Sequence, residues 1–291
     1  MKPTPGQGEA LAAWGIWAVV TAVVLVTYSW VAPAETYNVS RDGIVGGLSR
    51  ALTFVNFPTA LVAIVLALIA MAVLPPVAWW IAAPAIALCT TIPLFNEQAH
   101  LDAHWGNAIP AAGVLLALGL TVAATRRAGS ALAPPRPWDR WRLVAAVTIA
   151  LVSLPWITAE LGFHLPGDVF MGEELGREKD GTVIAAVHLG HHHGTDGAVL
   201  VLTALLLSRV LVEPGRMRIV VFAAIGSLLA YGGVNFVQDA WNEQLYKRGW
   251  TDVSIPSAIL PGLRPIWIVV VALAVLATAL LLREEKSYSA G

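Results

Sequence analysis

Histidine is concentrated in one short stretch of the chain. Four of the seven histidines fall within six positions, in the segment VHLGHHHGTDG. On a helix, residues at i, i+4 and i+8 share a face, so His188, His192 and Asp196 would form one row with His191 beside them. Imidazole and carboxylate groups are ligands of first-row metal ions, and an i, i+4 histidine pair can bind one ion. This segment therefore predicts one wall of a metal site.

The same helix would carry small residues on its opposite face. Gly190, Gly194 and Gly197 fall on that side, where small residues allow a neighbouring membrane helix to approach closely. His193 would point away from the row of ligands, and we do not expect it to bind the metal. The segment thus predicts a helix that packs on one face and binds a metal on the other.

Two further segments place histidines and carboxylates at helical spacing. In NEQAHLDAHWGN, a helix would bring Glu97, His100 and His104 to one side. In SLPWITAELGFH, Glu160 and His164 share a face at i, i+4. Both segments lie at ends of apolar runs, so we expect their ligands to join those of the histidine-rich segment.

These segments supply more ligands than one tetrahedral ion needs, so the sequence predicts a site for one or two divalent transition metal ions. Zinc and iron are the expected metals, and copper is the third candidate, although the methionines and the single cysteine do not cluster with the histidines. Either Glu97 or Glu160 would act as the general base of a metal-dependent reaction. The predicted ligands are Glu97, His100, His104, Glu160, His164, His188, His191, His192, Asp196 and Asp239.

Further polar residues are predicted to bind a substrate. Arg50 and Asn56 belong to one row of GLSRALTFVNFP, and the guanidinium of Arg50 suits an anionic headgroup or a phosphate. Asn235, Gln238 and Asn242 follow helical spacing in YGGVNFVQDAWNEQLY. The alternative interpretation is that these amides only hydrogen-bond to neighbouring helices.

The composition determines the class of protein that must position these residues. Of the 291 residues, 57% are hydrophobic and 13% are charged, and the mean hydropathy is +0.70. A soluble domain carries about 25% charged residues. We therefore predict an all-α polytopic integral membrane protein. Nothing in the chain resembles a nucleic-acid-binding motif, and the HExxH pattern of metalloproteases is absent.

A membrane-spanning helix needs about 20 mostly apolar residues. By this criterion the sequence predicts a bundle of about eight transmembrane helices that form a single domain over residues 1–291. The expected helices are 11–32, 51–74, 77–95, 108–125, 142–162, 183–212, 218–246 and 265–282.

The distribution of charge predicts the orientation of this bundle. With an even number of spans, both termini and the loops near 126–142 and 209–218 lie on one side, which carries 11 Lys and Arg against 5 Asp and Glu. The other side carries 7 Lys and Arg, 14 Asp and Glu, and all seven histidines. Basic residues favour the cytoplasmic side, so we expect cytoplasmic termini and an extracytoplasmic polar cavity.

The functional hypothesis is a metal-dependent membrane enzyme, either a hydrolase or an oxidoreductase, in a bacterial plasma membrane. Its substrate would be a lipid-like or amphiphilic molecule, because the cavity opens near the outer leaflet. The alternative is a protein without catalysis: a transporter of metal ions or protons, or an extracytoplasmic sensor of pH or metal. A transporter needs a polar route through the bilayer, whereas the predicted polar residues lie on one side.

Overall fold

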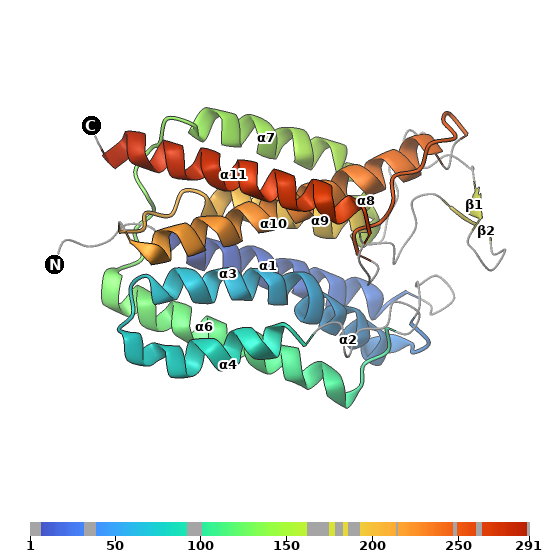
Figure 1. Ribbon diagram of the computed structural model, residues 1–291. Helices are drawn as coiled ribbons and strands as arrows, with labels where there is room; N and C mark the ends of the chain where they lie inside the picture. Colours follow the sequence, from blue (N-terminus) through green and yellow to red (C-terminus); the bar gives the residue numbers. More distant parts are fainter. Residues whose placement is uncertain are drawn as a thin grey trace.

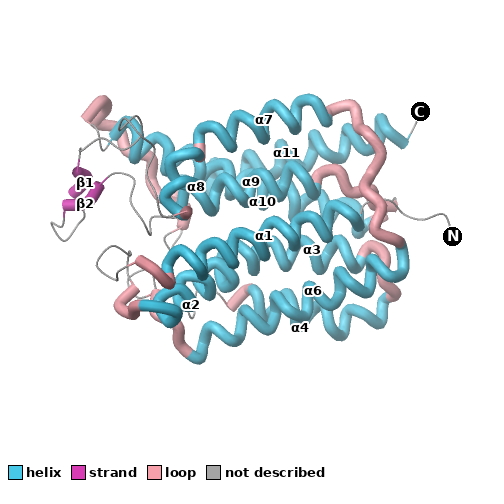
Figure 2. Tube along the Cα trace, turned by 180° about the vertical axis from the view of Figure 1, so that it is seen from behind, coloured by secondary structure: helices cyan, strands magenta, loops and turns pink. Residues whose placement is uncertain are grey.

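The computed structural model describes residues 7–31, 39–91, 101–161, 175–177, 183–185, 193–213, 215–246, 249–259 and 264–289. These residues form a bundle of helices that run along a common direction (Figure 1; seen from behind in Figure 2). The longer helices are α1 (Gln7–Tyr28), α2 (Gly43–Phe54), α3 (Ala60–Met71), α4 (Trp79–Cys89), α6 (Ala108–Ala128), α7 (Asp139–Val152), α9 (His193–Leu207), α10 (Arg216–Trp241) and α11 (Ile266–Ser289).

Shorter elements connect or extend these helices. The π-helical segment η2 (Val55–Thr59) joins α2 to α3, and a second one, η5 (Asn242–Tyr246), extends α10. The 3₁₀ turns η3 (Pro76–Ala78) and η4 (Trp105–Asn107) precede α4 and α6, and α8 (Leu154–Glu160) follows α7. Strands β1 (Leu175–Arg177) and β2 (Val183–Ala185) form a small antiparallel pair.

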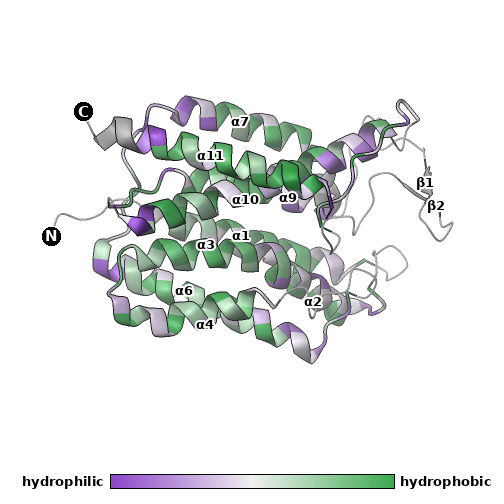
Figure 3. Ribbon diagram, in the orientation of Figure 1, coloured by the Kyte–Doolittle hydropathy of each residue, from purple (hydrophilic) through white to green (hydrophobic). Residues whose placement is uncertain are grey.

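Helix α1 begins and helix α11 ends at the same end of the bundle, which we call the termini end (Figure 1). The opposite end, where α1 ends and α11 begins, is the distal end. Hydrophobic residues fill the length of the helices, and hydrophilic residues gather towards both ends (Figure 3). Among the described residues, five helical segments are long and apolar enough to cross a membrane: Gln7–Tyr28, Gly43–Met71, Trp105–Ala128, Arg216–Tyr246 and Ile266–Glu285.

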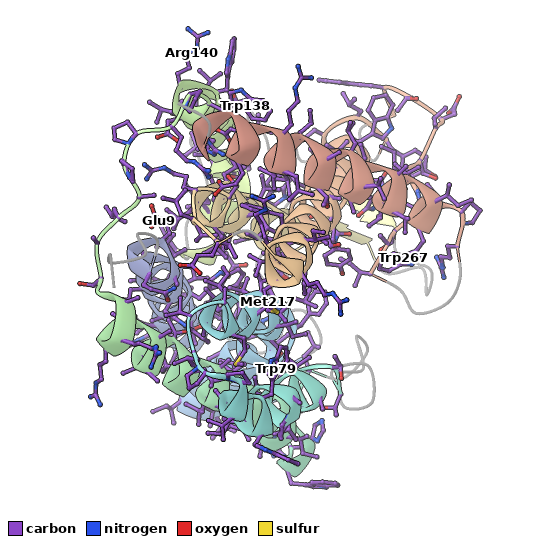
Figure 4. The ribbon with its side chains drawn as sticks, turned by 60° about the vertical axis from the view of Figure 1, so that its left-hand side comes forward. Glu9, Trp79, Trp138, Arg140, Met217 and Trp267 are labelled. Carbon is purple, nitrogen blue, oxygen red and sulfur yellow. The ribbon has the colours of Figure 1, made fainter. Side chains whose placement is uncertain are left out.

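Two apolar clusters hold the bundle together. One lies between α1, α3, α9 and α10, and the other joins α3, α4 and α6, largely through alanines. Trp14, Leu61 and Met217 pack against both clusters, and Figure 4 shows Met217 between the two groups of helices. Small residues at these interfaces let the helix backbones approach closely, which is the usual basis of helix association in a membrane.

The contact between α9 and α10 depends on two glycines. A Cβ atom added to Gly197 would lie 2.6 Å from the backbone nitrogen of Phe236, and one added to Gly232 would lie 2.8 Å from Cβ of Leu200. On the neighbouring face of α9, a Cβ at Gly194 would lie 2.5 Å from the ring of Trp156. The predicted packing role of Gly194 and Gly197 is therefore confirmed, whereas Gly190 lies outside the described residues.

Proline explains the irregular segment between α2 and α3. Pro58 has no backbone N–H, and in a regular helix its ring would collide with the carbonyl of Phe54. The wider π-helical turn of Val55–Thr59 accommodates this proline within one continuous helical path. The same turn holds Asn56, which is fully buried.

The structure differs from the predicted helix over residues 183–212. Val183–Ala185 form strand β2, and the described helix extends only over His193–Leu207. Val183 and Ile184 are β-branched, and such residues favour the extended backbone of a strand. The predicted continuous helix through the histidine-rich segment is therefore wrong at its start.

Candidate functional site

A cluster of buried polar side chains occupies the distal end of the bundle. We define this distal cluster as Arg50 of α2, Asp196 of α9, Asn235 and Asp239 of α10, and Glu243 of η5. All five side chains are buried, and Arg50 and Glu243 are fully enclosed. Buried ionisable groups within apolar helices are costly and normally mark a function.

Arg50 connects α1, α2 and α9 at this cluster. Its guanidinium lies over the ring of Tyr28, 5.3 Å from the ring centroid, in a cation–π contact. It also interacts electrostatically with Asp196, which in turn interacts with Asp239. Two neighbouring carboxylates repel one another unless a cation or a proton compensates them, so Asp196 and Asp239 form a pair that favours a cation.

Helix α10 presents one polar face to this cluster, because its residues recur at i, i+4 and i+8. Along that face lie Tyr231, Asn235, Asp239 and, in η5, Glu243. The hydroxyl of Tyr231 is hydrogen-bonded to the side chain of Asn235, and Tyr231 also interacts electrostatically with Asp196. This face therefore extends the polar region over several turns of the helix.

Helix α8 covers the cluster from the side. Trp156 donates a hydrogen bond from Nε1 to Oε2 of Glu243 at 2.5 Å. Its ring packs against Gly194 and makes an edge-to-face contact with Phe236, with the ring centroids 5.9 Å apart. Glu160 is also buried and lies one turn further along α8, on the same face as Trp156.

Several buried oxygen and nitrogen atoms near the distal cluster lack a hydrogen-bond partner among the residues that the structure describes. They include Oδ1 of Asp196, Oδ1 of Asn235, Oε1 of Gln238 and both polar atoms of the Asn56 side chain. Burying a polar group without a partner costs about 1–3 kcal/mol in proteins. These atoms therefore point to a ligand, an ion or a further polar group at this end of the bundle.

Carboxylates are the most frequent charged groups of this region among the described residues. Those of Glu160, Asp196, Asp239 and Glu243 are buried, and the guanidinium of Arg50 interacts electrostatically with Asp196. A buried carboxylate is stable when a cation, a hydrogen bond or a proton compensates its charge. The region is therefore suited to a positively charged partner.

His104 does not join the buried cluster. Residues 101–104 are not helical, so the predicted row along this segment is interrupted there. Instead, His104 is exposed and caps the turn η4. Its Nδ1 accepts a hydrogen bond from the Gly106 N–H at 3.1 Å, and its backbone N–H donates to Oδ1 of Asn107 at 2.7 Å. One nitrogen of this imidazole thus caps a helix, and the role of His104 as a metal ligand stays a prediction.

Asn242 makes two hydrogen bonds to the backbone of Ile255. Its Nδ2 donates to the carbonyl of Ile255 and its Oδ1 accepts from the Ile255 N–H, both at 2.9 Å. The side chain thus mimics a backbone peptide and fixes residues 249–259 to the end of α10. Its role in substrate binding stays a prediction.

Six predicted metal ligands lie outside the described residues: Glu97, His100, His164, His188, His191 and His192. Within the described part of the chain, no three His, Cys, Asp or Glu side chains are grouped so that they could hold a metal ion. The metal site therefore stays a prediction. The described carboxylates Asp196 and Asp239 are the part of it that the structure brings together.

A second buried polar region lies at the termini end, and the sequence did not predict it. We call it the termini-end network. It contains Glu9 (labelled in Figure 4), Arg136, Asp139, Arg142, Ser208, Arg209, Glu284 and Glu285. It ties α1, α7, α9, α11 and the segment 129–138 together.

The bonds of Arg142 are central to this network. Its guanidinium donates to Oε1 and Oε2 of Glu284 at 3.0 and 2.5 Å, and its Nε donates to Oγ of Ser208 at 2.7 Å. Arg136 forms an ion pair with Glu285 and donates to the carbonyl of Ser208 at 3.0 Å. These bonds attach α7 and α11 to the end of α9.

Asp139 and Arg209 complete the network. Nε of Arg209 lies 3.1 Å from Oδ1 of Asp139, and its Nη1 lies 3.3 Å from Oε1 of Glu9. Partial burial opposes ionisation of Asp139, but the Arg136 N–H and the guanidiniums of Arg209 and Arg142 outweigh it and hold its pKa below the ordinary value. Asp139 therefore stays ionised at neutral pH.

Three features of these sites escaped the sequence interpretation. Glu243 lies four residues after Asp239, and this spacing was a usable signal for a further carboxylate on the same face. The partner of Arg50 had no such signal, because Asp196 lies on a different helix, far away in the sequence. The burial of Glu284 and Glu285 also had no signal, because their partners Arg142 and Arg136 are distant in sequence.

Comparisons of the chain with protein-family models, with curated proteins and with solved structures found no match.

Proposed function

We propose that the chain is an integral membrane protein with eight transmembrane helices and cytoplasmic termini, in a bacterial plasma membrane. Five helices meet the length and hydropathy of a span, and Pro76–Cys89 and Gly194–Leu207 are shorter apolar helices. Exposed tryptophans support this arrangement, because aromatic residues favour both membrane interfaces. Trp79, Trp80 and Trp141 start helices at the termini end, whereas Trp30, Trp105 and Trp250 lie at the distal end.

The ion pairs of the termini-end network reduce the positive charge that bears on the orientation of the chain in the membrane. Arg136, Arg142 and Arg209 are compensated by acids of the termini-end network and contribute little to the positive charge there. Arg126, Arg127, Arg140 and Arg216 are exposed at the same end. These exposed arginines support a cytoplasmic location of the termini end.

The proposed function is that of a membrane metalloenzyme whose site is the distal cluster. Asp196 and Asp239 bind a divalent transition metal ion, zinc or iron, together with histidines of the segment that precedes α9. The observation that carries this proposal is the interacting pair of buried carboxylates, Asp196 and Asp239, in which Oδ1 of Asp196 has no hydrogen-bond partner among the described residues. Asp196 also lies four residues after His192. Carboxylate and imidazole form the ligand sets of such ions.

The proposed reaction is a hydrolysis or an oxidation of a lipid-like or amphiphilic substrate. Glu160 is buried at the edge of the cluster and is the described candidate for a general base. Asn235 and Gln238 each have an oxygen without a hydrogen-bond partner within the described part of the chain, and they are suited to bind polar groups of the substrate. Arg50 interacts with Asp196. We therefore propose that Arg50 positions this carboxylate and does not bind an anionic group of the substrate.

Metal analysis of the purified protein tests this proposal. Asp196→Asn preserves the size of the side chain but removes its charge, and we expect a loss of bound metal. Asp252→Asn is the matched control, because Asp252 is exposed. Equal metal content in the two variants and the unmodified protein would contradict the assignment of Asp196.

A second candidate function is transport of a metal ion or a proton, and one observation favours it. Buried ionic groups flank both ends of α9: Asp196 lies near its start, and the termini-end network surrounds Ser208 just after its end. Carriers place ionisable groups along such a route. Flux into proteoliposomes distinguishes the candidates, since an enzyme gives turnover without uptake and a carrier gives uptake that Asp196→Asn abolishes.

A further inference from the structure

Helix α7 is attached to the bundle in an unusual way. In α7, Arg142 is the one residue that is buried, whereas α10 buries eleven residues. The large apolar side chains of α7 face outwards, including Trp141, Leu143, Val147 and Leu151. Figure 1 and Figure 4 show α7 at the edge of the molecule, and Arg140 near its start points away from the other helices.

In a bilayer, exposed apolar side chains gain nothing by leaving lipid for protein, so helices associate through close packing and polar contacts. At its start, α7 is held by the bonds of Arg142 to Glu284 and Ser208. The backbone N–H of Trp138 adds a bond to Oε1 of Glu284 at 3.2 Å. Polar contacts at the termini end are therefore the main attachment of this helix.

The junction between α7 and α8 interrupts the helical hydrogen bonding. Pro155 has no N–H and cannot bond to the carbonyl of Leu151. Ser153 bridges the break: its N–H donates to the carbonyl of Ile149 and its carbonyl accepts from the Ile157 N–H, both at 2.9 Å. Proline in this position allows a change of angle without loss of either helix.

At the distal end, α8 is held by Trp156. Its bond to Glu243 and its contact with Gly194 close the side of the distal cluster that faces α8. The unit from 139 to 160 thus has one polar attachment near each end, a hinge between them and an apolar outer surface. The distal cluster lies directly behind one of these attachments.

We propose that α7 and α8 form a lateral door between the bilayer and the distal cluster, through which an amphiphilic, lipid-like molecule enters. The identity of this cargo rests on the proposed function. Opening separates Trp156 from Glu243 and Gly194, and the bonds of Arg142 keep the door closed at rest. The apolar outer surface of α7 lets the unit move within lipid at little cost.

Cysteine labelling tests both the movement and its direction. The single native cysteine, Cys89, is replaced by serine, and a cysteine is introduced at Thr195, which is buried on α9 beside Gly194. The probes are N-ethylmaleimide, which dissolves in the membrane, and a charged maleimide, which does not. Arg142→Gln removes the attachment at the termini end, and Arg140→Gln is the matched control, because Arg140 is exposed and its guanidinium lies over the ring of Trp141.

We expect Arg142→Gln to raise the rate of labelling by N-ethylmaleimide at least about tenfold, as local opening becomes more frequent. Arg140→Gln should leave the rate unchanged, and the charged maleimide should label neither variant faster. Equal acceleration by both reagents would overturn the proposal, because the opening would then face water. An unchanged rate in Arg142→Gln would overturn it as well.

Trp156→Phe covers the case in which Arg142→Gln does not fold. It keeps the aromatic packing on Gly194 and removes the N–H donor to Glu243, so we expect faster labelling by N-ethylmaleimide alone. Metal content is measured on the same samples without the probe. A protein that binds no metal but shows this labelling pattern would lose the proposed function and keep the door.

Discussion

The termini-end network makes a sharp prediction about stability at the pair Arg136–Glu285. Both residues are buried, with 5% of each exposed, and Arg136 also donates to the carbonyl of Ser208. Glu285→Ala leaves the guanidinium buried without its carboxylate partner. Breaking a buried ion pair in this way costs about 3–5 kcal/mol, whereas an exposed pair contributes about 0–1 kcal/mol.

The double variant Arg136→Met/Glu285→Leu removes both charges and replaces them with apolar side chains. Such replacements are often neutral or stabilising, so we expect its free energy of unfolding within about 1 kcal/mol of the unmodified protein or above it. The assay is reversible unfolding in mixed micelles, completed as a double-mutant cycle with the single variants Arg136→Met and Glu285→Leu. Glu213→Ala is the control, because Glu213 is exposed. A loss below about 1 kcal/mol for Glu285→Ala would refute the assignment of a buried pair.

Three further predictions concern other contacts of the structure. Asn242→Ala removes both hydrogen bonds to Ile255, so it should lower the free energy of unfolding by about 1–3 kcal/mol. It should also speed amide hydrogen exchange in residues 249–259 without loss of metal, and an unchanged exchange rate would contradict this prediction. Because the pKa of Asp139 is lowered in the folded protein, this group contributes stability above its ordinary pKa of about 3.9, and the contribution disappears as the pH falls through the lowered value. Thermal unfolding measured from pH 7 to pH 3 should therefore show a smaller acid-induced loss of stability in Asp139→Asn than in the unmodified protein. Parallel profiles of the two proteins would contradict this role of Asp139. Gly232→Val should disrupt the contact of α10 with α9, whereas Gly233→Val should be tolerated, since no atom lies within 4 Å of a Cβ at Gly233; equal melting temperatures would refute the close approach.

Helical periodicity predicted the polar face of α10 well. The spacing of Asn235, Gln238 and Asp239 placed all three on one side, and all three are buried. The same spacing could not distinguish Asn242, because its partner is the backbone of Ile255, thirteen residues away. Patterns within one helix show which residues share a face, and they do not show what that face meets.

The partners of charged residues were the least predictable part. Arg50 interacts with Asp196 across 146 positions of sequence, through the tertiary arrangement of α2 and α9. Glu284 is the partner of Arg142, which lies 142 positions earlier in the chain. His104 shows the converse: its type and spacing suggested a ligand, but the local need to cap a helix determines its contacts. Such outcomes depend on tertiary packing or on competing local bonds.

The proposed function depends on the binding of a divalent metal ion by the buried carboxylates Asp196 and Asp239 of the distal cluster. The most direct measurement is elemental analysis of the protein purified from membranes, before and after reconstitution with zinc or iron. We predict about one or two bound ions per chain, lost in Asp196→Asn and retained in Asp252→Asn. Less than about 0.2 ions per chain in the reconstituted unmodified protein would contradict the claim.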